Sequence, residues 1–142
     1  MASIERLRLP EQLPQPISHY TDAVVADGWI WISGMLALDA SGALIGGDDV
    51  VAQAERVHEI IKAVLAKAGA GFEDVVKVTV YLRRIEDRAA VNTVRRRFFG
   101  ESRPASTLVE VSAFVIPGAL VEIDAVARQP ERLGEPASRP LR

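Results

Sequence analysis

Hydrophobic residues recur with two different periods along the chain. Over residues 75–82 (VVKVTVYL) they alternate, which predicts a β-strand with the even-numbered residues on its apolar face. Over residues 50–68 they recur every three or four positions, which predicts a helix with one apolar stripe. Asp48 or Asp49 can cap this helix, and Gly69 stands where a C-terminal glycine belongs.

Shorter runs complete the pattern. Residues 23–33 form two predicted strands joined at Asp27-Gly28, a dipeptide typical of tight hairpins. A second helix is predicted to begin at Glu86 or Asp87 and to end near Gly100. The other predicted strands cover residues 3–9, about 106–111 and about 120–127. The order β-β-α-β-α-β-β, after the first of these strands, predicts an α+β fold with a mixed sheet and two helices on one sheet face.

The other face of this sheet carries a set of large apolar and polar residues: Trp29, Trp31, Thr79 and Tyr81. Such a face is too apolar to stay in water, and an exposed patch of this kind usually marks an association surface. We therefore expect an oligomer.

Composition narrows the chemistry. The 142 residues suffice for one domain, predicted over residues 1–127 with a mobile tail over residues 128–142. The chain has no cysteine, which excludes disulfides, thiolate nucleophiles and iron–sulfur clusters. Its only histidines are His19 and His58, so no metal site is expected.

Charge and hydropathy bear on whether the chain binds nucleic acid or a membrane. The net charge of −2 gives no general case for nucleic acid. No apolar stretch is long enough to cross a bilayer, and the N-terminus lacks the apolar centre of a secretory signal. We expect a cytoplasmic protein that does not bind membranes.

Two carboxylates form the first candidate for chemistry. Glu122 and Asp124 lie two residues apart on a predicted strand and therefore share a face, about 7 Å apart. Two carboxylates that resist ionising together can perform acid–base catalysis, and Glu110 on the preceding predicted strand could join them. A solvated polar strand face is the alternative, and spacing alone favours it.

Basic residues and histidines form a second set of candidates for chemistry. The arginines of the predicted second helix and the turn before it are Arg83, Arg84, Arg88, Arg95, Arg96 and Arg97. An exposed helix face paired with acidic neighbours is favoured over an anion or RNA surface, because stacking aromatics are absent. His58 is interpreted as a helix-surface residue, and His19 as a loop residue that could reach a pocket. Ser33-Gly34 at a strand end could bind a small polar ligand, but alone it is a weak signal.

Several of these segments, in this order, resemble the RidA/YjgF family of imine and enamine deaminases, also called the endoribonuclease L-PSP family. The resemblance spans about residues 14–127. The matching stretches are 16–23 (PISHYTDA), 31–34 (WISG), Gln53 with 61–69 (IKAVLAKAG), 74–82 (DVVKVTVYL), 90–94 (AVNTV), 98–100 (FFG), 104–111 (PASTLVEV) and 117–127 (PGALVEIDAVA).

This resemblance implies a chorismate-mutase-like fold assembled as a homotrimer, with the sheets lining an inner barrel and a small-molecule site in the cleft between subunits. It also implies hydrolysis of 2-imino or 2-enamino acids to 2-keto acids and ammonia without a metal or an organic cofactor.

The resemblance also assigns residues. Tyr20, Ser33, Gly34 and Asn92 match the family's ligand-binding positions. Glu122 matches the glutamate that positions the hydrolytic water, which reverses the preference for a solvated strand face, and Asp124 is left as its structural neighbour.

One departure concerns substrate binding. Where the family's deaminases carry an arginine that pairs with the substrate carboxylate, this chain has Ser106. Leu108 and Met35 likewise replace residues that are often more polar. We expect a simple 2-imino acid to bind more weakly, by a few kcal/mol for a lost charge-assisted pair, unless Arg103 or His19 supplies the charge.

Three functions follow in order. The first is hydrolytic deamination of an imine or enamine metabolite other than a simple 2-imino acid. The second is a non-catalytic trimer that binds a small metabolite. The third is an endoribonuclease, which only the arginine cluster supports.

Overall fold

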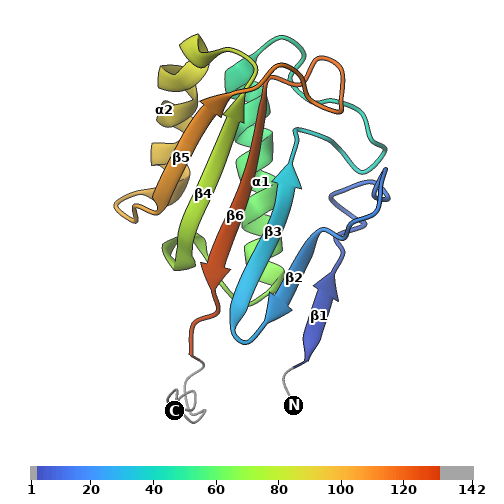
Figure 1. Cartoon of the computed structure of the whole chain (residues 1–142), viewed down its shortest axis with the longest axis vertical. Helices are drawn as coiled ribbons and strands as arrows, with labels where there is room; N and C mark the ends of the chain where they lie inside the picture. Colours follow the sequence, from blue (N-terminus) through green and yellow to red (C-terminus); the bar gives the residue numbers. More distant parts are fainter. Residues whose placement is uncertain (1–2, 132–142) are drawn as a thin grey trace.

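A six-stranded mixed sheet carries two helices on one face in the computed structural model, which describes residues 3–131. The strand order is β1-β2-β3-β6-β4-β5. Figure 1 shows α1 and α2 together behind this sheet. The strands are β1 (Ile4–Leu7), β2 (Ala23–Ala26), β3 (Trp29–Met35), β4 (Val75–Leu82), β5 (Ala105–Glu110) and β6 (Val121–Arg128). The helices are α1 (Val50–Lys67) and α2 (Arg88–Phe99). The predicted α+β class, mixed sheet and one-sided helices are confirmed.

Two predicted turns and caps are present. Asp27 and Gly28 both have positive φ, 52° and 79°, which is the backbone of a tight hairpin between β2 and β3. The Asp49 side chain caps α1 by accepting hydrogen bonds from the backbone N–H groups of Val51 and Ala52. Both features arise from neighbouring residues, so local sequence was sufficient to predict them.

The second helix begins later than predicted. A short 3₁₀ turn covers Ile85–Asp87, and α2 starts at Arg88. The helix ends at Gly100, which has a φ of 59° and whose N–H bonds to the carbonyl of Arg96.

The expectation that Glu110 could join the carboxylates of β6 is wrong. Strand β4 lies between β5 and β6, and β5 runs parallel to β4 rather than forming a hairpin with β6. The Glu110 carboxylate accepts a hydrogen bond from the backbone N–H of Ile85 at 3.0 Å. Residue order along the chain does not reveal this pairing, because parallel strands are joined by a long crossover, here α2.

Strict alternation along β4 also fails at its start. The register with β6 shifts between Val75 and Lys77, and Val75 is buried whereas Val76 is 42% exposed. One extra residue in the strand reverses the faces of the residues before it. From Lys77 to Leu82 the predicted alternation holds.

A buried glutamine joins α1 to the segment before β6. The Gln53 amide nitrogen donates to the carbonyls of Gly47 and Gly118, and its amide oxygen accepts from the N–H of Leu120 at 2.8 Å. Gln53 and Leu120 are both buried, so breaking the bond between them would leave buried polar groups without a partner. This network fixes the point from which β6 enters the sheet.

The face of the sheet that the helices do not cover has the predicted aromatic character. Trp31 lies opposite Val126 of β6 and is 52% exposed, and Tyr81 lies opposite Glu122. The Arg128 guanidinium lies over the Trp29 ring, 5.4 Å from its centroid. The predicted tail begins at this arginine, the last residue of β6, and residues 132–142 lie outside the described residues. No helix within residues 3–131 is long and apolar enough to cross a membrane.

His58 is buried, so its interpretation as a helix-surface residue is wrong. Its ring stacks on Phe98 with centroids 5.1 Å apart and also contacts Phe72 and Phe99. Nδ1 lies 2.7 Å from the carbonyl oxygen of Ala54, so Nδ1 carries the proton, while Nε2 is buried with no partner within residues 3–131. Burial lowers the pKa of His58 from 6.5 to about 4, and the positive charges of Arg95 and Arg97 add to this effect.

His58 should make the fold sensitive to mild acid. The unfolded chain binds a proton at this residue below pH 6.5 and the folded chain only below about pH 4, so stability falls as the pH drops through this window. The loss should reach about 3 kcal/mol, from the linkage between pKa and stability. Urea unfolding of wild type and His58→Phe between pH 7 and pH 4 gives the difference between their free energies of unfolding. As the pH falls, wild type should lose stability relative to His58→Phe, which has no titratable group at residue 58. A constant difference across that range would contradict the assignment.

Candidate active site

A pocket of about 380 Å³ lies beside the end of β3 and the start of β6. Tyr20, Ser33, Gly34 and Glu122, four residues predicted for the site, line it together. Its other lining residues are Leu13, Pro14, Ile17, Ser18, Asp22, Met35, Leu36, Leu38, Val115 and Ile116. One polar end with Glu122 and Ser33 therefore faces largely apolar walls, which is typical of a small-molecule site.

An irregularity in the sheet places Ser33 and Gly34 in this pocket. The register between β3 and β6 shifts between Ile32 and Met35, so these two residues lie where regular pairing is interrupted. The Ser33 hydroxyl donates to the carbonyl of Thr21 at 2.6 Å. Its proton is thereby used, and its oxygen remains an acceptor for a ligand.

Gly34 leaves the space that the Glu122 carboxyl occupies. A Cβ atom at residue 34 would lie 2.5 Å from Glu122 Oε2 and 2.9 Å from Cδ, both closer than non-bonded atoms allow. The φ of Gly34 is outside the left-handed region, so close approach rather than backbone conformation requires glycine here. The carboxyl therefore lies directly against the β3 backbone.

The environment of Glu122 favours its protonated form. The side chain is half-buried, and burial raises the pKa of Glu122 above its ordinary value of 4.5, with the charge of Asp124 raising it further. Asp124 accepts a hydrogen bond from the Tyr81 hydroxyl at 2.9 Å, and this bond is the main cause that raises the pKa of Tyr81. Glu122 can thus exchange a proton more readily near neutral pH than an exposed glutamate can.

An ion pair between Arg8 and the buried Asp22 holds the chain segment that carries Tyr20. The Asp22 carboxylate accepts from Arg8 Nε at 2.9 Å and from the N–H of Leu9 at 2.8 Å. These bonds tie the end of that segment to the residues after β1 and fix one wall of the pocket. Tyr20 itself is 47% exposed, so its hydroxyl is available to a ligand.

The other three predicted site residues lie elsewhere. Asn92 is on α2, and Ser106 and Leu108 are on the edge strand β5, where Ser106 is in register with the core residue Val78 on the helix side of the sheet. Of these three residues, only Asn92 lines a second pocket of about 520 Å³, between the end of α2 and the loop to β5. It is lined by Asn92, Arg95, Arg96, Phe99, Gly100, Glu101, Ser102, Arg103 and Pro104.

One chain does not join these two groups of residues. Strand β4 separates β6 from β5, a distance of roughly 10 Å at ordinary strand spacing. Glu122 also shares the uncovered face with Tyr81, whereas Ser106 contacts α2 on the helix face. The candidate residues therefore form two separate groups in each chain. We call them the Glu122 half-site, with Tyr20, Ser33 and Gly34, and the Asn92 half-site, with Ser106 and Leu108.

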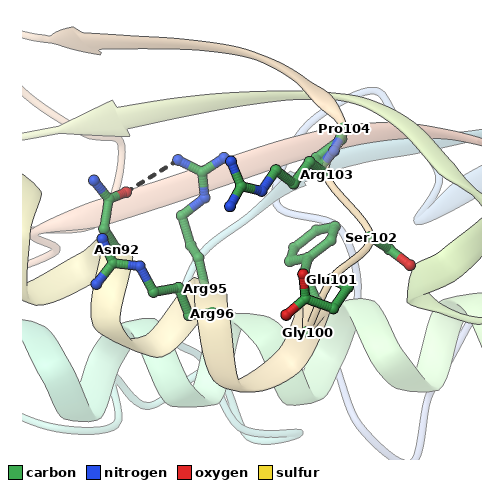
Figure 2. Close-up of a pocket in the computed structure, with 9 residues that line it drawn as sticks. Asn92, Arg95, Arg96, Gly100, Glu101, Ser102, Arg103 and Pro104 are labelled. Atoms are coloured by element: carbon green, nitrogen blue, oxygen red, sulfur yellow. Dashed lines mark hydrogen bonds between the residues drawn. The ribbon is translucent and has the colours of Figure 1, made fainter.

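Arg95 belongs to the Asn92 half-site, and sequence reasoning missed it. Its two terminal nitrogens donate to Asn92 Oδ1 at 3.1 Å and to Ser106 Oγ at 2.9 Å, and Figure 2 shows the first of these bonds. The interpretation as one exposed basic face is wrong for this residue, which is half-buried. Its spacing of three residues from Asn92 on a helix was the signal that could have identified it.

The remaining candidates contribute less. Arg97 pairs with Glu55 at 3.3 Å, as expected for a solvated helix face. His19 is exposed and lines neither pocket, Met35 is buried in the wall of the Glu122 half-site, and Arg103 lines the second pocket. Within residues 3–131, no three His, Asp or Glu side chains are grouped so that they could hold a metal ion.

Comparison with known proteins places this geometry in a family. A family model described as Endoribonuclease L-PSP matches residues 10–129. The chain belongs to this family, RidA/YjgF. A 3-aminoacrylate deaminase RutC from Acinetobacter baylyi is 40% identical over 84% of this chain and 94% of its own length. A 2-iminobutanoate/2-iminopropanoate deaminase from Capra hircus is 40% identical over 89% of this chain and 91% of its own.

A solved structure confirms the fold. The crystal structure of RidA from the Antarctic bacterium Psychrobacter sp. PAMC 21119 has a TM-score of 0.80 and 34% sequence identity, and the match covers 87% of this chain and 98% of that one. The resemblance identified from the sequence is thus correct for the family and the fold.

Glu122 should lower stability at neutral pH. Because its folded-state pKa is raised, the ionised carboxylate disfavours the folded state above that pKa, and the cost disappears as the pH falls below 4.5. Glu122→Gln should therefore be more stable than wild type at pH 7 and lose this advantage near pH 4, measured by urea unfolding. Glu11→Gln, at an exposed position, is the control for replacing a glutamate by glutamine. Equal stability of wild type and Glu122→Gln at pH 7 would contradict the assigned environment.

Gly34→Ala should displace the Glu122 carboxyl without unfolding the protein. The clash is with the end of a flexible side chain, so the free energy of unfolding should change by less than about 1 kcal/mol. The displaced carboxyl becomes more hydrated, so its pKa, followed by carbon-13 NMR, should move down toward 4.5. Gly71→Ala is the matched control, because its Cβ would meet Glu73 Oε2 at 2.6 Å far from either pocket; it should leave the Glu122 pKa unchanged.

Proposed function

We propose that this chain forms a homotrimer that hydrolyses an imine or enamine metabolite to a carbonyl compound and ammonia, with each active site in the cleft between two subunits. The observation that carries this proposal is the half-buried Glu122 carboxyl against Gly34, in a pocket with Tyr20 and Ser33. The deaminases among the relatives are consistent with this reaction.

The reaction requires a held water and a route for protons. A protonated imine carbon is electrophilic, so the water oxygen forms a bond to it while Glu122 accepts the proton that the water loses. Glu122 then returns this proton to the nitrogen. The carbon–nitrogen bond breaks, ammonia leaves with the electron pair, and Glu122, again a carboxylate, accepts the remaining hydroxyl proton as the carbonyl forms. An enamine enters the same sequence after protonation at carbon. A carboxyl with a raised pKa suits these transfers.

Separation of the two half-sites supports an intersubunit site. Neither half-site alone combines an acid–base group with the polar side chains of α2 and β5. The uncovered sheet face, with Trp31 half exposed, offers an apolar surface for association. A neighbouring copy could place its Asn92 half-site opposite the Glu122 half-site, and a ring of three copies would complete each site in turn.

With Ser106, the part of this site expected to contact the substrate carboxylate differs from that of the family's imino-acid deaminases. A serine hydroxyl can donate one hydrogen bond but brings no charge, and Leu108 and Met35 add apolar surface. The substrate is therefore held differently from a simple 2-imino acid anchored by an arginine on the strand.

Mixing two inactive variants tests both the reaction and the shared site. Glu122→Gln and Asn92→Leu damage different half-sites, so each alone should lose turnover of 2-iminobutanoate or 3-aminoacrylate, measured as ammonia release. Trimers refolded from an equal mixture should recover about a quarter of wild-type activity, because one site in four draws two intact half-sites.

Three results would count against this proposal. Turnover by Glu122→Gln alone would remove its catalytic role, and inactivity of the mixed trimers would remove the shared site. A wild-type trimer that binds 2-oxobutanoate yet turns over neither substrate would instead be a metabolite-binding protein. Arg88→Gln, exposed at the start of α2, is the control and should keep full activity.

A further inference from the structure

Arg95 differs from the three arginines that form salt bridges within residues 3–131. Arg8, Arg56 and Arg97 each lie within 4.0 Å of a carboxylate oxygen. Arg95 has no such partner within residues 3–131, although it is half-buried and burial lowers the pKa of its guanidinium. An arginine remains charged at neutral pH despite this effect. The structure thus holds a partly desolvated cation with no counter-charge.

Two neutral side chains orient this cation. Asn92 Oδ1 and Ser106 Oγ each accept one hydrogen bond from a terminal nitrogen, at 3.1 and 2.9 Å, which fixes the guanidinium plane between α2 and β5. The bonds leave its other N–H groups without partners within residues 3–131. A guanidinium held in this way is ready to bind a carboxylate, because little side-chain entropy is lost on binding.

The surroundings favour an anion. Figure 2 shows the side chains of Arg95 and Arg103 directed toward each other in the second pocket, and Arg96 also lines it. Glu101 is the one carboxylate among the lining residues. No salt bridge joins Glu101 to these arginines within residues 3–131, so the positive charge is not neutralised locally.

We propose that Arg95 determines substrate specificity by binding the carboxylate of an imino or enamino acid, with Asn92 and Ser106 orienting its guanidinium. This rests on the proposed function and names its substrate class. The charge that position 106 lacks is supplied from α2, through a hydrogen bond to the serine that stands there. The expectation that Arg103 or His19 would have to supply it is replaced by this assignment.

Calorimetric binding of 2-oxobutanoate, compared with its uncharged amide 2-oxobutanamide, tests the assignment. Arg95→Gln should raise the Kd of the acid at least about tenfold, as expected for loss of a charge-assisted pair, and leave the Kd of the amide unchanged. Arg95→Lys should lie between wild type and Arg95→Gln, because a lysine keeps the charge but not the planar fork. Arg88→Gln should match wild type.

A second test moves the arginine from position 95 to position 106 and measures a gain of affinity rather than a loss. The double variant Arg95→Gln/Ser106→Arg should recover most of the affinity for the acid, and gel filtration should show that every variant remains a trimer. The inference is overturned if wild type binds acid and amide equally, if Arg95→Gln has no effect, or if Arg103→Gln alone abolishes the preference for the acid.

Failure of the inference is distinguishable from failure of the proposed function. Turnover that depends on Glu122 but not on Arg95 would keep the deaminase and overturn the Arg95 assignment. A preference for the acid that depends on Arg95, without turnover of either substrate, would support Arg95 and remove the deaminase.

Discussion

The organisation of the site depends on the absence of a side chain at residue 34. Without a Cβ there, the Glu122 carboxyl can lie against the β3 backbone, partly removed from water and near the charge of Asp124. The same carboxyl on a regular, solvated strand face would have an ordinary pKa and little use as a proton carrier. The register shift between Ile32 and Met35 creates this arrangement, so an irregularity of the sheet produces the chemical environment.

The order of strands then sets what a single chain can and cannot do. With β4 between β6 and β5, Glu122 and Ser106 lie on different strands and on opposite faces of the sheet. In a single copy, the pocket with the candidate acid–base group Glu122 contains no side chain of α2. The second pocket contains polar side chains of α2 but not Glu122. Association would be a requirement of the chemistry as well as a means of covering the aromatic sheet face.

Under the proposal for Arg95, a serine at position 106 does not prevent the chain from binding a carboxylate. A guanidinium can enter the same space from a helix instead of a strand, because the long arginine side chain spans the gap between them. Arg95 makes this approach, and Ser106 changes from a missing cation into the acceptor that orients one. Comparing a sequence with a family pattern position by position does not reveal that an arginine at another position can supply the charge.

Features decided by neighbouring residues were predictable: the Asp27-Gly28 hairpin, α1 with its Asp49 cap, and the end of α2 at Gly100. Residue types alone favoured a solvated face for Glu122, whereas its side chain is half-buried in the structure. The bulge at Val75, the burial of His58 and the bonds of Arg95 depend on contacts between segments far apart in the chain. Periodicity records which face a residue occupies but not what the fold packs against it. The chain pattern therefore fixed the elements and the fold class, whereas the tertiary structure decided which polar groups lose water and which charges meet.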